Sequence, residues 1–389
     1  GAERFAAFEA SARQFLHPEG REWRMGDRFA QPDLAGTLER IARDGREGFY
    51  GGETAAAIVR EMEQGGGLIT LDDLAAYRAV WRKPLRHRFQ GVDFVAMPPP
   101  SSGGVAMAQI LLMIEAAGWP NQDPNSAAVR HLYAEAMSRA FADRSTHLGD
   151  PDFFPVPLDS LLSAGYAHER MSSYVPERHT PSSEIRHGSF APPSESMETT
   201  HFSVMDPLGN AVAVNTTLNG SFGNFVTVGG AGFLLNNEMD DFSIKPGVPN
   251  MYGLIGAEAN AIEPGKRMLS SMTPVIAVRD GKTVLVSGGA GGPRIITAVM
   301  QTALNVLHFG MNAQEAIHAP RVHHQWLPDV LFHETNGLST ETLQTLQSYG
   351  YELREVGGLA RVHMLVADEN GRIHGGADPR GGGGHVAGY

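Results

Sequence analysis

In the first half of the chain, apolar residues recur at the three- and four-residue spacing of an amphipathic helix. This spacing predicts helices around Leu34 and Ile58 and over residues 105–117 and 127–142. Thr70-Leu71-Asp72-Asp73 resembles a capping box, which predicts that a further short helix begins there. The first half of the chain is therefore predicted to be mainly helical.

Short alternating strands replace this pattern after residue 198. Paired apolar runs flank turn sequences, of which Asp280-Gly281 is the strongest hairpin signal in the chain. The predicted hairpins cover residues 201–216, 275–286 and 362–374, and helices are predicted at 293–309 and 340–348. A further strand at 92–96 ends near a run of prolines, which cannot donate to a sheet. This mixture predicts stacked antiparallel sheets with helical outer layers.

Residues 177–198, between the two patterns, are rich in proline and serine and offer little to bury. Chains tolerate cleavage in linkers of this kind. We therefore divide the chain into a mainly helical part, residues 1–198, and a β-rich part, residues 199–389. The two parts together are expected to form one structural domain.

The composition is that of an acidic globular protein, with 31 Lys and Arg against 43 Asp and Glu and a net charge of -12. This balance argues against nucleic acid or an anionic membrane surface as the main partner, because both bind basic patches. The absence of cysteine excludes disulfides, thiolate catalysis and cysteine-based metal sites. No apolar run approaches the ~20 residues that span a bilayer. The first residues form no signal peptide and lack an initiator methionine, so the natural chain is expected to start upstream.

A candidate nucleophile lies where the linker meets a strand, at Glu198-Thr199-Thr200-His201. A hydroxyl is a weak nucleophile at neutral pH and needs a nearby base. Cleavage before Thr199 would free an α-amino group with a pKa of ~7.7–8.0, which can accept the proton of the hydroxyl in the same residue. The simpler interpretation, favoured by this segment alone, is that the two threonines begin a strand.

A glycine-rich segment, Ser287 to Arg294, follows a predicted strand and opens a predicted helix. Glycines let the backbone approach a ligand, and helix N-termini offer unpaired N–H groups. The segment lacks the lysine of a phosphate-binding loop and the parallel strands of a dinucleotide site. Binding of an oxyanion is the better functional interpretation, and a plain glycine-rich turn is equally compatible with this segment alone.

An acidic run within Leu234 to Ser243 places Glu238, Asp240 and Asp241 close together. Its spacing does not fit a calcium-binding EF-hand loop. Recognition of an ammonium group is the sharper interpretation, and a solvated acidic turn is the usual one. The adjacent pair His323-His324 suggests a metal site, but neighbouring residues of a strand point to opposite faces, so structural hydrogen bonding is favoured.

Taken together and in this order, the motifs of the chain resemble the γ-glutamyltransferase (glutathione hydrolase) family of the N-terminal-nucleophile hydrolases. The resemblance covers essentially the whole chain. The motifs that carry it are Gly66 to Thr70, Met97 to Gly104, Ala142 to Ser145, Thr199 to His201, Leu234 to Ser243, Leu269 to Met272, Gly291 to Arg294, Pro320 to Trp326 and Ala377 to Arg380.

The resemblance implies a precursor that cuts itself between Glu198 and Thr199, and a γ-glutamyl-enzyme formed on the Thr199 hydroxyl with the freed amine as base. The matches that would assist Thr199 are Thr217, which holds it in place, and Gly291 and Gly292, the oxyanion-binding pair. The matches for the α-amino group of the substrate are Asn219, Glu238 and Asp241, and those for its α-carboxylate are Ser270 and Ser271. Water or an amino acid or peptide amine would release glutamate or a new γ-glutamyl product. No metal and no organic cofactor are implied.

The resemblance also implies an α+β fold, the four-layer αββα sandwich of these hydrolases, which here apparently lacks the upstream part of the large subunit. That part carries an arginine that pairs with the substrate carboxylate, and no residue of this chain is assigned its role. Residues 245–257, with Tyr252, resemble the lid over the glutamyl pocket in many bacterial members. The large and small subunits of one precursor would form a heterodimer, periplasmic or secreted as in bacterial relatives.

Two alternative functions are also compatible with the sequence. The first is a related acylase that cleaves cephalosporin or glutaryl side chains, whose members tend to have a shortened lid. The second is an uncleaved, inactive precursor that only binds a ligand or partner.

Overall fold

The computed structural model describes residues 1–120, 122–186, 199–243, 245, 248, 251, 256–381 and 384–388. Its Cα packing divides the chain into two compact units. The smaller unit comprises residues 1–82 and 220–237, and the larger one comprises residues 83–219 and 238–389. The predicted subunit boundary at 198/199 concerns cleavage, and both it and the expectation of one structural domain stay predictions.

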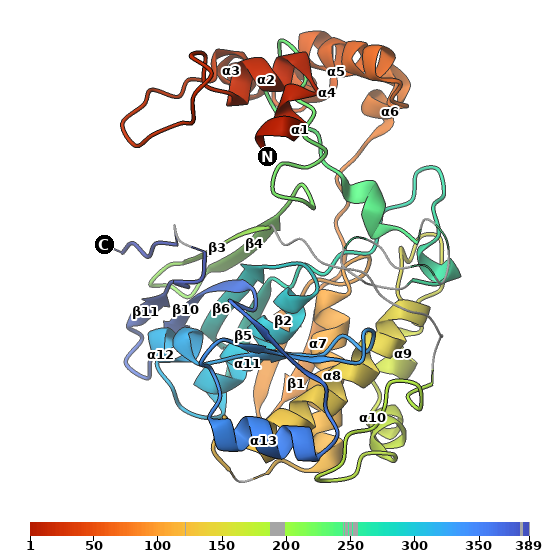
Figure 1. Ribbon diagram of the computed structural model, residues 1–389, viewed down its shortest axis with the longest axis vertical. Coiled ribbons are helices and arrows are strands. Elements are labelled where there is room, and N and C mark those ends of the chain that lie inside the picture. The colour runs from red at the N-terminus through yellow and green to blue at the C-terminus, as the bar shows by residue number, and fades with distance from the viewer. Residues whose placement is uncertain are drawn as a thin grey trace. The chain divides into compact units, whose positions relative to one another are not determined.

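The smaller unit is helical, as its amphipathic patterns predict (Figure 1). Its helices are α1 (Ala2–Ala6), α2 (Glu9–Phe15), α3 (Pro32–Asp44), α4 (Glu47–Tyr50), α5 (Gly52–Gly65) and α6 (Leu71–Ala76). Helix α6 begins with the predicted capping box: Asp73 N–H donates to Thr70 Oγ1 (3.2 Å), and Thr70 N–H donates to Asp73 Oδ2 (2.8 Å).

Residues 220–237 join these helices through side chains that bond to their backbone. The Ser11 hydroxyl donates to the carbonyl of Phe225 (2.7 Å), and the Thr37 hydroxyl donates to that of Ala231 (2.8 Å). All of these groups are buried. A segment far along the sequence is thereby drawn into the first compact unit, which explains why a division of the chain at one point does not describe the packing.

The larger unit is built on a six-stranded antiparallel sheet in the order β1-β2-β5-β6-β10-β11. Its strands are β1 (Leu85–Phe89), β2 (Val92–Ala96), β5 (Val275–Arg279), β6 (Lys282–Ala290), β10 (Arg361–Ala367) and β11 (Ile373–Gly376). The predicted hairpins around Asp280-Gly281 and around Gly371 are confirmed: β5 pairs with β6, and β10 pairs with β11. Strand β1 was not predicted, because its five residues include two arginines and a histidine and so give little apolar signal.

Seven α-helices belong to the described part of this unit. They are α7 (Gly103–Ala117), α8 (Ala127–His147), α9 (Leu158–Leu161), α10 (Ala164–Met171), α11 (Arg294–Leu307), α12 (Ala313–His318) and α13 (Thr340–Ser348). All but α9 contribute to one large apolar core, and α9 packs with α7 in a smaller cluster. Helices α7 and α8 are buried on almost every side, so their apolar residues do not form a single stripe. None of the helices among the described residues is long and apolar enough to cross a bilayer.

A two-stranded hairpin, β3 (Thr200–Met205) and β4 (Ala211–Thr216), packs against β6 and β10. Successive residues of a strand point to opposite faces of a sheet. In β6, Leu285 lies in the core with the helices, whereas Gly288 faces the hairpin residue His201. The larger unit therefore contains a helical layer, a six-stranded sheet and the hairpin, which makes it a mixed α/β fold.

A third, smaller sheet was not predicted. It joins β7 (Val322–His323), β8 (Leu331–Glu334) and β9 (Leu353–Val356), with β8 and β9 parallel and α13 connecting them. These strands are only two to four residues long, too short for a periodic pattern to identify them.

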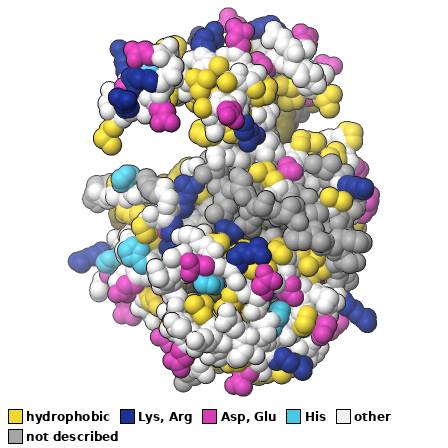
Figure 2. All heavy atoms as spheres, viewed as in Figure 1, with side chains coloured by type: hydrophobic (Ala, Val, Ile, Leu, Met, Phe, Trp, Pro, Cys, Tyr) yellow, Lys and Arg dark blue, Asp and Glu magenta, His cyan; other side chains and the backbone are white. Residues whose placement is uncertain are grey.

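On the face in view in Figure 2, acidic and basic side chains are interspersed rather than gathered by sign.

Candidate active site

The β3–β4 hairpin brings Thr199 and Thr217 opposite each other. Thr200 pairs with Thr216 in the antiparallel register, so the next pair outward is Thr199 with Thr217. Asn219 follows with a left-handed backbone (φ 69°), and its N–H donates to the Thr217 hydroxyl oxygen (2.8 Å). This turn keeps Asn219 buried beside the two threonines.

His201 and Asn215 fix this hairpin on the large sheet. The imidazole Nδ1 of His201 lies 2.9 Å from Asn215 Oδ1, and Asn215 Nδ2 donates to the carbonyl of Gly289 on β6 (2.6 Å). Burial lowers the pKa of His201 to about 4, so its ring is neutral at physiological pH. The start of β3 is thereby held next to the end of β6.

At the end of β6, Gly291 and Gly292 both have positive φ, 144° and 55°. A Cβ on Gly291 would lie 2.7 Å from the Cα of Ala360, so the close approach of two backbones requires glycine there. Helix α11 begins two residues later at Arg294. Neither glycine N–H donates a hydrogen bond to any other residue that the structure describes. These donors are available to an oxyanion, as the sequence predicts.

A hollow in the larger unit gathers most of the predicted site residues. Its lining consists of Thr199, Thr217, Asn219, Asp241, Ser270, Ser271, Met272, Gly292 and Ile295. Of the remaining predicted residues, Gly291 adjoins Gly292, and Glu238 begins the short helix η1 (Glu238–Asp241) that ends at Asp241. Glu198 and Tyr252 lie outside the described residues. Met272 and Ile295 are lining residues that the sequence did not single out.

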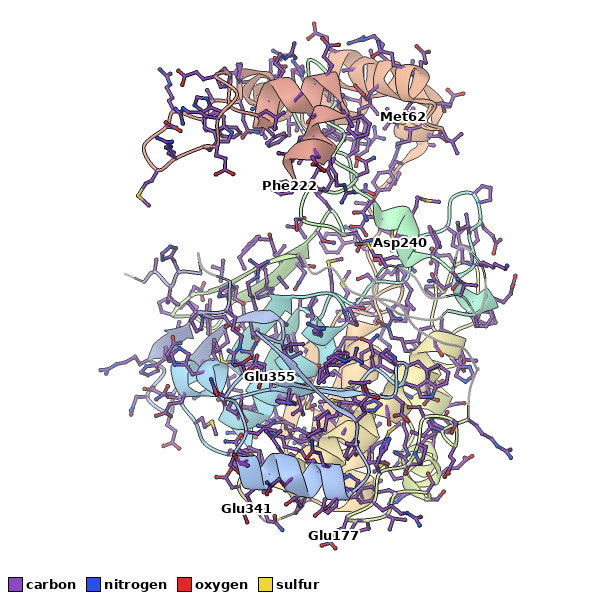
Figure 3. All side chains as sticks on the ribbon, in the orientation of Figure 1. Met62, Glu177, Phe222, Asp240, Glu341 and Glu355 are labelled. Carbon is purple, nitrogen blue, oxygen red and sulfur yellow. The ribbon has the colours of Figure 1, made fainter. Side chains whose placement is uncertain are left out.

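Helix η1 presents two carboxyl groups with raised pKa values; Asp240, between them, is labelled in Figure 3. Burial raises the pKa of Glu238 to about 7. Burial and then the neighbouring Glu238 charge raise the pKa of Asp241 to about 8. Burial is the main cause of both shifts, and the charge of Arg144 only partly offsets the shift of Asp241. A bound ammonium group would favour the ionised form of both carboxyls.

The segment Ser270-Ser271-Met272 is held by the segment that contains Ser101, Ser102 and Gly103. Ser102 N–H and the Ser102 hydroxyl both donate to the carbonyl of Ser270 (2.8 and 2.6 Å), and the Ser101 hydroxyl donates to that of Met272 (2.6 Å). A Cβ on Gly103 would lie 2.3 Å from the same Met272 carbonyl oxygen. The motif Met97 to Gly104 therefore supports the serines, a role that the sequence did not assign.

Arg144 on α8 is a second supporting residue that sequence analysis missed. It is 4% exposed, and its guanidinium donates to the hydroxyls of Ser102 (2.8 Å) and Ser271 (3.1 Å). Burial lowers its pKa to about 10, so it stays charged at neutral pH. The sequence offered one indication of this role, an arginine within a helix that is otherwise buried. A buried charge without hydrogen-bond partners is costly, so such an arginine is expected to have a specific function.

Three groups near β7 are close enough to share a metal ion: His179, His324 and Asp329. In the structure, each of the two histidines lies within hydrogen-bond distance of Asp329. Burial lowers the pKa of His179, but hydrogen bonds to Asp329 and Glu135 outweigh burial and raise it to about 9, so both ring nitrogens carry hydrogen. The Trp326 N–H donates to His324 Nδ1 (3.2 Å), and His324 Nε2 lies 3.2 Å from Asp329 Oδ1. The three groups thus contact one another and Glu135 as a buried network, in line with the structural interpretation.

The adjacent His323 is likewise engaged in hydrogen bonds rather than in a metal site. Its Nδ1 lies 2.8 Å from the Thr297 hydroxyl, and its Nε2 lies 3.0 Å from Gln325 Oε1. The structural interpretation of the histidine pair agrees with these contacts.

Comparison with known proteins gives the context of this site. A sequence model described as Gamma-glutamyltranspeptidase matches residues 1–388. The chain is 47% identical to the glutathione hydrolase proenzyme of Escherichia coli over 95% of its own length and 64% of that protein. It is 46% identical to the glutathione hydrolase proenzyme of Pseudomonas aeruginosa over 92% of its own length and, again, 64% of that protein.

Among solved structures, the cephalosporin acylase from Bacillus halodurans is similar, with a TM-score of 0.82 and 26% identity. That match covers 97% of this chain and 66% of the acylase chain. The chain thus spans about two thirds of the length of the relatives that it matches. Because the family model and the E. coli and P. aeruginosa relatives agree over nearly all of it, the chain belongs to the gamma-glutamyltranspeptidase family.

Proposed function

We propose that this chain is part of a self-cleaving γ-glutamyltransferase and hydrolase whose nucleophile is Thr199. The observation that carries the proposal is the hollow in which Thr199, Thr217 and Gly292 meet Asp241, Ser270 and Ser271. It combines a hydroxyl nucleophile, backbone N–H donors, an acidic group and two serine hydroxyls. These are the groups needed to hold both ends of a glutamyl group and to attack its side-chain amide.

The chemistry follows from the position of Thr199 after the linker. Cleavage between Glu198 and Thr199 frees the Thr199 α-amine, which takes the hydroxyl proton as Oγ forms a bond to the γ-carbonyl carbon. The N–H groups of Gly291 and Gly292 stabilise the resulting oxyanion. The amine then gives its proton to the leaving nitrogen as the amide bond breaks. Water or an acceptor amine attacks the ester in turn, and the hydroxyl of Thr199 recovers its proton.

The substrate is proposed to be a γ-glutamyl compound such as glutathione. Its α-ammonium group would lie between Glu238, Asp241 and the side chain of Asn219. Its α-carboxylate would accept hydrogen bonds from Ser270 and Ser271. The acidic pair favours this class over the acylase alternative, because a glutaryl group has no ammonium to balance two carboxylates. The identity to the glutathione hydrolase proenzyme of E. coli is also higher than that to the Acylase ACY 1 proenzyme of Pseudomonas sp. (strain V22), 47% against 34%.

We further propose that the complete protein has the four-layer αββα architecture. Within the described residues the hairpin has only two strands, so each of its outer edges lacks a partner. Its outer face is apolar and exposed, with Phe202 at 50%, Val204 at 55% and Val212 at 51%. Exposed strand edges and apolar faces of this kind are normally covered. Further strands and an outer helical layer would cover them, in a processed heterodimer that is periplasmic or secreted.

The first test is self-cleavage of the full-length protein, measured by intact mass under denaturing conditions. We expect two fragments, the smaller one beginning at Thr199, and turnover of a γ-glutamyl-anilide. Thr199→Ala is expected to abolish both cleavage and turnover, since it removes the attacking hydroxyl.

Thr200→Ala is the matched control, because Thr200 is the neighbouring exposed threonine on β3. It should retain cleavage and most of the activity. Activity that persists in Thr199→Ala would contradict the mechanism, and a single uncut wild-type species would favour the inactive precursor.

A further inference from the structure

A buried arginine lies next to the predicted carboxylate subsite, although it is not among the residues that line the hollow. Arg144 lies behind Ser271, on helix α8, and belongs to the motif Ala142 to Ser145. A guanidinium can only donate hydrogen bonds. At Ser271 the hydroxyl oxygen is therefore the acceptor, at 3.1 Å from the arginine.

This constraint decides where the Ser271 hydrogen points. With its oxygen accepting from Arg144, the hydroxyl keeps its own hydrogen for another acceptor. Among the residues that the structure describes, no hydrogen bond uses that hydrogen, and Ser271 lines the hollow. The hydroxyl is thus oriented to donate into the hollow, where a carboxylate would accept.

The same guanidinium also orients Ser102. The Nε–H of Arg144 donates to the Ser102 hydroxyl oxygen (2.8 Å), and that hydroxyl in turn donates to the carbonyl of Ser270 (2.6 Å). One arginine therefore holds both members of the serine pair, Ser271 directly and Ser270 through Ser102. Its charge also adds a positive potential beside Asp241.

We propose that Arg144 is the positioning residue of the carboxylate subsite, where it presents the Ser271 hydroxyl to a substrate carboxylate, anchors the backbone of Ser270 through Ser102, and so selects for carboxylate-bearing γ-glutamyl compounds. This inference rests on the proposed function. It assigns Arg144 no direct contact with the substrate.

The test compares two anilides in the full-length, processed enzyme. One is the γ-glutamyl-anilide, and the other is the 4-aminobutanoyl-anilide, which keeps the ammonium group but lacks the α-carboxylate. The measured quantity is the ratio of kcat/KM for the first compound to that for the second. In Arg144→Met we expect this ratio to fall by about tenfold to hundredfold, as for the loss of one charge-assisted hydrogen bond. The loss should lie mainly in the KM of the γ-glutamyl compound.

Arg144→Lys keeps the charge but not the forked donor geometry, so a smaller fall in the ratio is expected. Arg139→Lys is the matched control, because Arg139 is also buried on α8 but donates to Glu135 and Ser173 instead. Its ratio should equal that of the wild type. A purely structural role of Arg144 would lower kcat/KM for both anilides equally and leave the ratio unchanged, which would overturn the inference.

If Arg144→Met shows no cooperative unfolding transition, Ser102→Ala provides a second test. It removes one of the two hydroxyls to which Arg144 donates. The ratio should then fall severalfold, and an unchanged ratio would again overturn the inference. A wild-type enzyme that turns over neither anilide would overturn the proposed function itself. The two failures are therefore distinguishable.

Discussion

At the scale of single residues, the site is dominated by two carboxyl groups that are expensive to ionise. Glu238 and Asp241 lie at the two ends of one short helix, and burial raises the pKa of each, to about 7 and about 8. Perturbed pKa values of this kind cluster at functional sites. The pH at which a ligand binds should therefore report on them.

We expect substrate affinity to rise with pH between about 6 and 8, because both carboxyls must lose their protons to attract an ammonium group. The folded pKa values are raised, so the ionised pair is present only above that window. In Glu238→Gln the neighbouring negative charge is removed, which lowers the pKa of Asp241 and shifts the profile to lower pH. The measurement is KM for the γ-glutamyl-anilide as a function of pH.

Glu258→Gln, at an exposed position of the short helix η2 (Glu258–Asn260), is the control and should keep the wild-type profile. An unchanged profile in Glu238→Gln would mean that Glu238 does not influence Asp241.

At the scale of elements, the active geometry depends on how closely β3 approaches β6. A Cβ on Gly288 would lie 2.4 Å from the imidazole of His201, and 2.8 Å from Asn215 Oδ1. The imidazole cannot retreat easily, since both of its nitrogens have partners, Asn215 and Ser203. The glycine is what lets Thr199 lie beside Gly292.

Gly288→Ala should therefore displace β3 and slow self-cleavage by an order of magnitude or more, and cost about 1–3 kcal/mol of stability, as for overpacking of a core. The measurements are the rate of appearance of the two fragments and the free energy of unfolding in urea.

Gly357→Ala is the control, because a Cβ there meets nothing within 4 Å and the residue is exposed. Cleavage at the wild-type rate in Gly288→Ala would show that this contact does not position Thr199.

At the scale of the larger unit as a whole, buried ion pairs tie the C-terminal motif Ala377 to Arg380 to the turn that packs against Gly291. Arg321 donates to Asp378 (2.8 Å) and to the carbonyls of Leu359 and Ala360 (3.0 and 3.1 Å). Ala360 is the residue against which Gly291 packs. Asp378 also accepts from the N–H of Val362 (2.8 Å). The network thus supports the turn that faces the glycine pair.

Asp378→Asn should lower the free energy of unfolding by about 3–5 kcal/mol, because it leaves the buried Arg321 without its counter-charge. Urea denaturation monitored by circular dichroism measures this change.

Asp368→Asn breaks an exposed pair with His374 instead and should cost less than about 1 kcal/mol. Equal losses in the two variants would contradict a special role for the buried network.

Local signals were sufficient for much of the fold. The Asp280-Gly281 turn predicted the β5–β6 hairpin, and Thr70 with Asp73 predicted the start of α6, because both depend on interactions within a few residues. Strand β1 escaped prediction although its partner β2 is the next strand in the sequence, because its residues give little apolar signal. The strands of the small sheet escaped because they are short, and β8 pairs with β9 across an intervening helix. The grouping of residues 220–237 with the first helices also depends on distant contacts.

By itself, the sequence determined the candidate groups and the family: a threonine after a proline- and serine-rich linker, a glycine pair before a helix, an acidic run and a serine pair, in the order of one family. Only the tertiary structure decided that these groups line one hollow, since they extend from Thr199 to Gly292 in the sequence and meet only through packing such as that of β3 on β6. It also decided that Arg144 stands behind Ser271, because hydrogen-bond partners 127 residues apart leave no local pattern. Burial, which sets the pKa values of Glu238 and Asp241, is likewise a property of packing rather than of composition.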